Sequence, residues 1–81
     1  MYADNITGYN MTNEQRNKIE ILIPAMVAIA RPVGSMHSWW QLINELQMII
    51  EGKKINMPVD YYINEAEQYF TDDGLDIPKY N

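Results

Sequence analysis

Ten consecutive apolar residues, Ile21 to Ala30, limit the folds open to this chain. The run is too short to cross a bilayer, and the sequence contains no longer apolar stretch. Arg31 and Pro32 follow it directly, and it lies too far from the N-terminus to be a secretory signal. Because a segment that is apolar on every face must be covered on several sides, the run predicts a central, buried helix.

The composition is typical of a small folded domain. Hydrophobic residues make up 47% of the 81 positions, which is too high a fraction for an intrinsically disordered chain. There is no cysteine, so disulfides and thiolate metal sites are excluded. A chain this short buries only about 60–65% of the surface that its unfolded form exposes, so self-association or a partner would add to its stability. Since Met1–Asp4 lacks the basic region of a signal peptide, we expect a cytoplasmic protein.

A capping box marks the start of the first predicted helix, which covers residues 12–31. The Thr12 hydroxyl is placed to accept a hydrogen bond from the Gln15 N–H, and the Gln15 side chain to accept one from the Thr12 N–H. Pro24 removes one backbone hydrogen bond, so we expect the helix to kink or break there. Residues 32–34 are expected to end it. The predicted buried face consists of Ile19, Leu22, Ile23, Met26, Val27 and Ala30.

The second predicted helix covers residues 35–51. Either Ser35 or Ser38 is suited to cap its N-terminus, and Gly52 is suited to the left-handed residue that follows a helix C-terminus. Its apolar positions recur at helical spacing and are Trp39, Leu42, Ile43, Leu46, Ile49 and Ile50.

The third predicted helix covers residues 58–71 and begins with Pro58, a residue favoured at the first helical position. Residues 1–11 are predicted to form an irregular arm, and residues 72–81 a tail. The sequence therefore predicts an all-α fold, a single small three-helix domain over 1–81 with a kinked or broken first helix. The apolar face of the third helix consists of Val59, Tyr62, Ile63, Ala66, Tyr69 and Phe70.

The charge distribution argues against nucleic-acid binding. The net charge is −5. Residues 1–40 hold equal numbers of acids and bases, so the whole excess lies in 41–81. Between Asp60 and Asp76 there are six carboxylates and no base. Such a surface repels a phosphate backbone and favours a basic protein surface.

Residues that carry catalysis or bind metals are sparse. His37 is the only histidine, and its neighbours Ser35 and Ser38 are better explained as helix caps, because adjacent positions on a helix point in different directions. The acidic turn 72–76 does not fit a calcium-binding loop, since Gly74 falls at the third position, where an oxygen ligand is required. We therefore predict a protein that is not an enzyme and holds no metal or cofactor.

Two adjacent aromatic pairs, Trp39-Trp40 and Tyr61-Tyr62, indicate a contact surface. Neighbours lie about 100° apart around a helix, so only one member of each pair faces the core. Trp39 and Tyr62 follow the apolar stripes, which leaves Trp40 and Tyr61 facing outward, where Trp and Tyr often anchor interfaces. A flanking aromatic also often covers the rim of a core, so both interpretations stay open. Met48 lies off the stripe of its helix and is expected near an interface.

These patterns predict a non-catalytic, acidic protein-binding module. Trp40 and Tyr61 would be its anchors, and its partner would have a basic surface of the kind common on nucleic-acid enzymes. A small acidic chain without catalytic motifs has the profile of phage-encoded inhibitors of host or defence functions, so we expect it to inhibit its partner by covering it. Neither direct nucleic-acid binding nor membrane binding is expected. The carboxylates expected to steer the partner are Glu65, Glu67, Asp72 and Asp73.

Two alternatives stay open. The first is an oligomer that sequesters a small anionic ligand, such as a nucleotide signal, held by Tyr9, Arg16 and Arg31 in the uncharged half of the chain. Ordinary solvated helix charges account for the same residues. The second is a structural subunit of a larger assembly, which buries Ile21–Ala30 against copies of itself and melts in a concentration-dependent manner.

Overall fold

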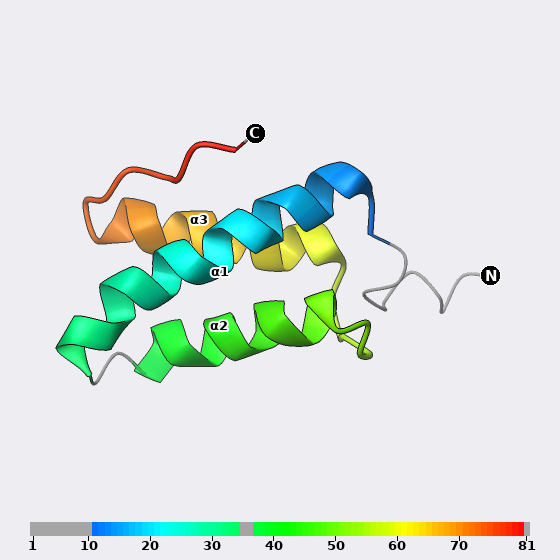
Figure 1. Ribbon diagram of the computed structural model, residues 1–81, viewed down its shortest axis with the longest axis horizontal. Helices are drawn as coiled ribbons and strands as arrows, with labels where there is room; N and C mark the ends of the chain where they lie inside the picture. The colour runs from blue at the N-terminus through cyan, green and yellow to red at the C-terminus, as the bar shows by residue number, and fades with distance from the viewer. Residues whose placement is uncertain (1–10, 35–36, 81) are drawn as a thin grey trace.

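The computed structural model describes residues 11–34 and 37–80, and this part of the chain folds into three α-helices without a strand (Figure 1). The helices are α1 (Asn13–Val33), α2 (His37–Ile50) and α3 (Val59–Asp72). Each helix contacts the other two, and in Figure 1 α1 crosses diagonally in front of α3 while α2 lies below it. The predicted all-α, three-helix fold is confirmed.

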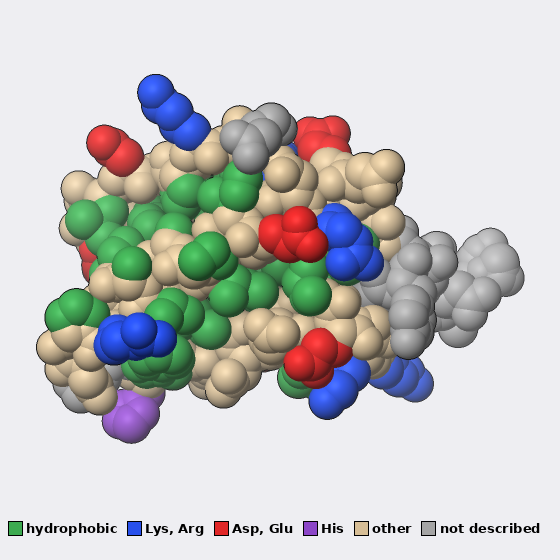
Figure 2. Space-filling view, in the orientation of Figure 1, with side chains coloured by type: hydrophobic (Ala, Val, Ile, Leu, Met, Phe, Trp, Pro, Cys, Tyr) green, Lys and Arg blue, Asp and Glu red, His purple; other side chains and the backbone are tan. Residues whose placement is uncertain are grey.

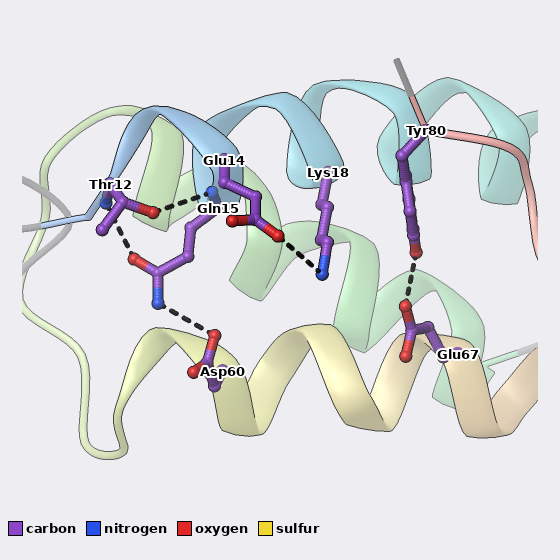
Figure 3. A network of polar contacts seen from close by, with 7 residues as sticks. All are labelled: Thr12, Glu14, Gln15, Lys18, Asp60, Glu67 and Tyr80. Atoms are coloured by element: carbon purple, nitrogen blue, oxygen red, sulfur yellow. Dashed lines mark hydrogen bonds and ion pairs between the residues drawn. The ribbon is translucent and has the colours of Figure 1, made fainter.

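The N-terminus of α1 has the predicted capping box. The Gln15 N–H donates to Thr12 Oγ1 at 3.0 Å, and the Thr12 N–H donates to Gln15 Oε1 at 2.8 Å. The same Gln15 amide reaches α3, where its Nε2 donates to Asp60 Oδ1 at 2.9 Å (Figure 3). One side chain therefore completes the cap and also joins the N-terminal ends of two helices.

Helix α1 continues through Pro24 as one element, so the chain does not break there. Pro24 is exposed, while Leu22 and Met26 on either side of it are fully buried. Burial of these side chains stabilises both turns and offsets the backbone hydrogen bond that proline cannot make. The helix also extends past the predicted end at residue 31 and stops at Gly34, whose φ is +80° and whose N–H donates to the Ala30 carbonyl at 3.1 Å.

Glycines in left-handed conformation end the other two helices. Gly52, as predicted, follows α2 with a φ of +79°. The Lys53 N–H donates to the Met48 carbonyl and the Gly52 N–H to the Ile49 carbonyl, both at 3.0 Å, which is the Schellman pattern. Gly74 follows α3 with a φ of +73° and the same pair of bonds.

The remaining helix bounds differ slightly from the expected ranges. Pro58 lies immediately before α3 rather than at its first position. The proposed cap Ser35 and the predicted arm, apart from Met11, fall outside the described residues, while Ser38 lies inside α2.

The hydrophobic core lies where the three helices meet. Trp39 of α2 packs against α3, with its ring 5.3 Å from the Phe70 ring in an edge-on arrangement and 5.8 Å from the Tyr69 ring. Every fully buried side chain of large volume is apolar; these are Phe70, Ile19, Leu22, Met26, Leu46 and Ile49. Most of the predicted apolar positions of the three helices are buried, and the others, such as Ile23 and Val27, are half-buried at the edge of the core.

The C-terminal segment turns back along the helices after α3 (Figure 1). The Tyr80 hydroxyl donates to Glu67 Oε2 at 2.7 Å, and the Lys18 ammonium lies 5.4 Å from the centre of the Tyr80 ring (Figure 3). Tyr80 thus connects the tail to both α1 and α3. Burial, together with the hydrogen bond and negative charge of Glu67, raises the pKa of the Tyr80 phenol above its usual value. Leu75 and Ile77 of the same segment remain exposed.

Candidate protein-binding groove

A groove of about 330 Å³ lies between α2 and α3, next to the loop that joins them. We refer to it as the α2/α3 groove. The lining residues on each helix recur every three or four positions, so they form the flank where the two helices face each other. They include Ser38, Gln41 and Glu45 of α2 and Tyr61, Glu65 and Tyr69 of α3.

The chemistry of the α2/α3 groove is acidic and aromatic. Glu45 and Glu65 line it together with three tyrosines, and no Lys, Arg or His is among its described lining residues. Both carboxylates are half-buried, so water screens them less than it screens a fully exposed charge. Carboxylates beside tyrosine rings suit a cationic side chain. Such a side chain donates hydrogen bonds to the carboxylates and is attracted to the rings by cation–π interaction.

The tyrosines of the groove are held by the core beneath them. The Tyr62 side chain is buried, and its ring meets the Tyr61 ring edge-on with centroids 5.3 Å apart. The Tyr62 hydroxyl accepts a hydrogen bond of 3.4 Å from the Asn56 N–H of the connecting loop. Tyr69 rests on Trp39. Tyr61, which is 43% exposed, is therefore an aromatic surface supported by buried neighbours.

Met48, predicted near an interface, is 39% exposed and lines a second hollow of about 100 Å³. This hollow shares Glu45, Asn56 and Tyr62 with the α2/α3 groove and so adjoins it. Lys54 also lines it, which places a base at this end. The two hollows together form a surface that changes from acidic and aromatic to mixed apolar and basic.

The structure separates the two predicted aromatic anchors. Tyr61 lines the groove, but Trp40 is half-buried, packs against the core and does not line it. On α2, Trp40 shares a flank with positions 43, 44 and 47, whereas the groove is lined by positions 38, 41 and 45. The two aromatics therefore do not act on one partner group in this groove.

The predicted acidic residues are similarly divided. Only Glu65 lines the groove. Glu67 accepts the hydrogen bond from Tyr80, Asp72 accepts one of 2.8 Å from Gln68, and Asp73 is exposed just after α3. Glu67 lies on the flank of α3 that faces α1 and the tail (Figure 3).

Two groove residues, Glu45 and Tyr69, are not among the contact residues predicted from the sequence. Helical periodicity predicts Tyr69 on the core face of its helix, whereas the structure leaves it half-buried at the groove. Their spacing from predicted contact residues along the helices could have identified both. Glu45 lies three residues before Met48, and Tyr69 lies four residues after Glu65, so each shares a helix face with a predicted contact residue.

The residues of the alternative ligand site do not come together. Arg16 forms a 3.9 Å ion pair with Glu20 near one end of α1, and Arg31 is exposed near the other end. Fifteen residues of helix separate the two arginines by about 22 Å, which is too far for one small anion. Tyr9 lies outside the described residues. His37 is exposed at the start of α2.

Within the described ranges, no helix is long and apolar enough to cross a membrane, and no cluster of three or more metal-ligating side chains is present. Comparison of the chain with protein families, with curated proteins and with solved structures found no match. The groove geometry and the charge distribution are therefore the basis for a functional proposal.

Proposed function

We propose that this chain is a non-catalytic, acidic protein-binding module that holds a basic segment of a partner protein in the α2/α3 groove. The observation that carries the proposal is the lining of that groove, where Glu45 and Glu65 lie beside three tyrosines and none of the described lining residues is a cation. An Arg side chain entering the groove would donate to these carboxylates and lie against the Tyr61 ring.

The charge of α3 supports a basic partner. The helix carries four carboxylates and no base, and Asp73 and Asp76 follow it. This field would attract a basic surface before contact and raise the rate of association, while repelling nucleic acid. Basic surfaces are typical of proteins that bind nucleic acids, so a module that covers one would inhibit its partner.

The test uses a short fluorescent peptide of alternating Arg and Ser, with a citrulline version as the uncharged control. Fluorescence anisotropy measures affinity, and amide chemical shifts locate the binding site. We expect Tyr61→Ala to weaken binding by about 2 kcal/mol, roughly thirtyfold in Kd, because it removes the exposed aromatic of the groove. Glu65→Gln should weaken it about tenfold.

The matched control is Asp73→Asn, which removes one carboxylate outside the groove and should change Kd less than about threefold. Equal losses in Glu65→Gln and Asp73→Asn would mean that net charge, and not the groove, attracts the peptide. Equal binding of the citrulline peptide would overturn the proposal altogether.

A further inference from the structure

A stripe on α1 combines charges of opposite sign at its two ends with apolar residues between them. Its members are Glu20, Pro24, Val27 and Arg31, whose spacings of four, three and four residues keep them on one face of the helix. Glu20, Pro24 and Arg31 are exposed, and Val27 is half-buried. We refer to these four residues as the α1 stripe.

Other half-buried apolar side chains pack against the edge of the core. They are Ile23, one position before Pro24 of the stripe, and Trp40 and Ile50 of α2. Figure 2 shows hydrophobic side chains gathered on the viewed face of the molecule, with a few charged side chains among them.

We propose that the α1 stripe is the contact surface for a second copy of this chain, with the two α1 helices packed antiparallel about a twofold axis near Ala25. The stripe is self-complementary in that arrangement. The midpoint between positions 20 and 31 falls next to Ala25, so the axis places Glu20 of each copy opposite Arg31 of the other. Val27 and Pro24 of the two copies then meet between these charges.

The few ion pairs that Glu20 and Arg31 make within one chain support this pairing. Arg31 forms no ion pair with any described residue, and Glu20 reaches Arg16 only at 3.9 Å, with both side chains substantially exposed. Both charges are thus accessible to a second copy. Two pairs would form per dimer, because a twofold contact repeats each interaction.

The distribution of charge favours a second copy over a basic partner at this face. Each chain has a net charge of −5, yet α1 contains three bases and two acids. Two acidic chains repel each other least when their neutral faces meet and their α3 helices point away. The stripe offers a basic partner no comparable excess of negative charge.

This proposal is independent of the α2/α3 groove. None of the four stripe residues lines the groove, so a dimer would present two open grooves. Failure of peptide binding would leave the dimer proposal intact, and a monomeric protein would leave the groove proposal intact.

The test is sedimentation equilibrium of the full chain over a range of micromolar to millimolar concentrations. We expect a reversible monomer–dimer equilibrium. Arg31→Glu and Glu20→Arg should each raise the dimer dissociation constant at least about tenfold, because each turns two attractive contacts into repulsive ones. The double variant Glu20→Arg/Arg31→Glu exchanges the charges and should restore most of the wild-type affinity.

The matched control is Lys79→Glu, which changes the net charge by as much as Arg31→Glu but lies on the exposed tail. It should leave dimerisation nearly unchanged, and Val27→Glu should abolish it. Circular dichroism checks that every variant is folded. A wild-type monomer at all concentrations, higher assemblies instead of a dimer, or failure of the charge exchange to restore association would each overturn the proposal.

Discussion

Replacing Pro24 with Ala is expected to stabilise the fold by about 2 kcal/mol. Pro24 is exposed inside a continuous helix, so the change removes no buried side chain. Proline in a helix interior costs about 3 kcal/mol relative to alanine. Alanine gives the unfolded chain more conformational entropy, which offsets roughly 0.4–1 kcal/mol of this stabilisation. The net gain in the free energy of unfolding is about 2 kcal/mol.

The assay is urea unfolding followed by circular dichroism, with the melting temperature as a second measure. For a domain of this size, the expected gain corresponds to a rise in Tm of about 10 °C. Ala28→Pro is the reverse control, because Ala28 is exposed and one turn further along the same helix. It should destabilise the protein by about 3 kcal/mol.

Since Pro24 belongs to the α1 stripe, the measurements are repeated at two protein concentrations to separate folding from association. A Pro24→Ala variant that is no more stable than wild type, or less stable, would contradict the expected cost of Pro24. It would mean that the packing of α1 depends on the local geometry that proline imposes.

Three further changes test the packing, the helix ends and the tail. Leu46→Ala should lower the free energy of unfolding by about 3–5 kcal/mol in the urea assay, since Leu46 is fully buried. Met48→Ala, on the exposed face of the same helix, should lower it by less than about 1 kcal/mol. Gly74→Ala should destabilise the fold by about 1 kcal/mol, because alanine is strained at a φ of +73° even though nothing lies within 4 Å of its Cβ. An unchanged stability would show that the helix end relaxes without loss. Stability should decline as the pH rises through about 10, because the raised pKa of Tyr80 lets the folded state keep a proton that the unfolded state releases. Tyr80→Phe should flatten that decline, and an unchanged pH profile measured by thermal melting would contradict the assigned hydrogen bond to Glu67.

The α2/α3 groove and the α1 stripe are proposed to serve two different kinds of contact. The groove combines carboxylates with tyrosines, and the stripe combines an apolar centre with one charge of each sign. An acidic protein with both would meet copies of itself through one face and a basic partner through the other. The peptide and sedimentation experiments test these two contacts separately.

Local sequence patterns predict the three helices and several of the residues at their ends. Thr12 and Gln15 form the capping box because they lie three positions apart, and Gly52 adopts a positive φ because it carries no Cβ. The buried residues follow from helical periodicity, which assigns Trp39 and Tyr62 to the core before any neighbour is known. These features depend on local spacing, so they are readable along the chain.

Which flanks of the helices meet depends on tertiary packing. Periodicity gives the direction of a side chain around its own helix axis, but not the position of the next helix. The packing of all three helices placed Glu45 beside Tyr61 and Glu65 and left Trp40 on another surface. Packing also explains why α1 continues unbroken through Pro24. Burial of Leu22 and Met26 outweighs the local backbone cost of proline, and that burial depends on the other helices.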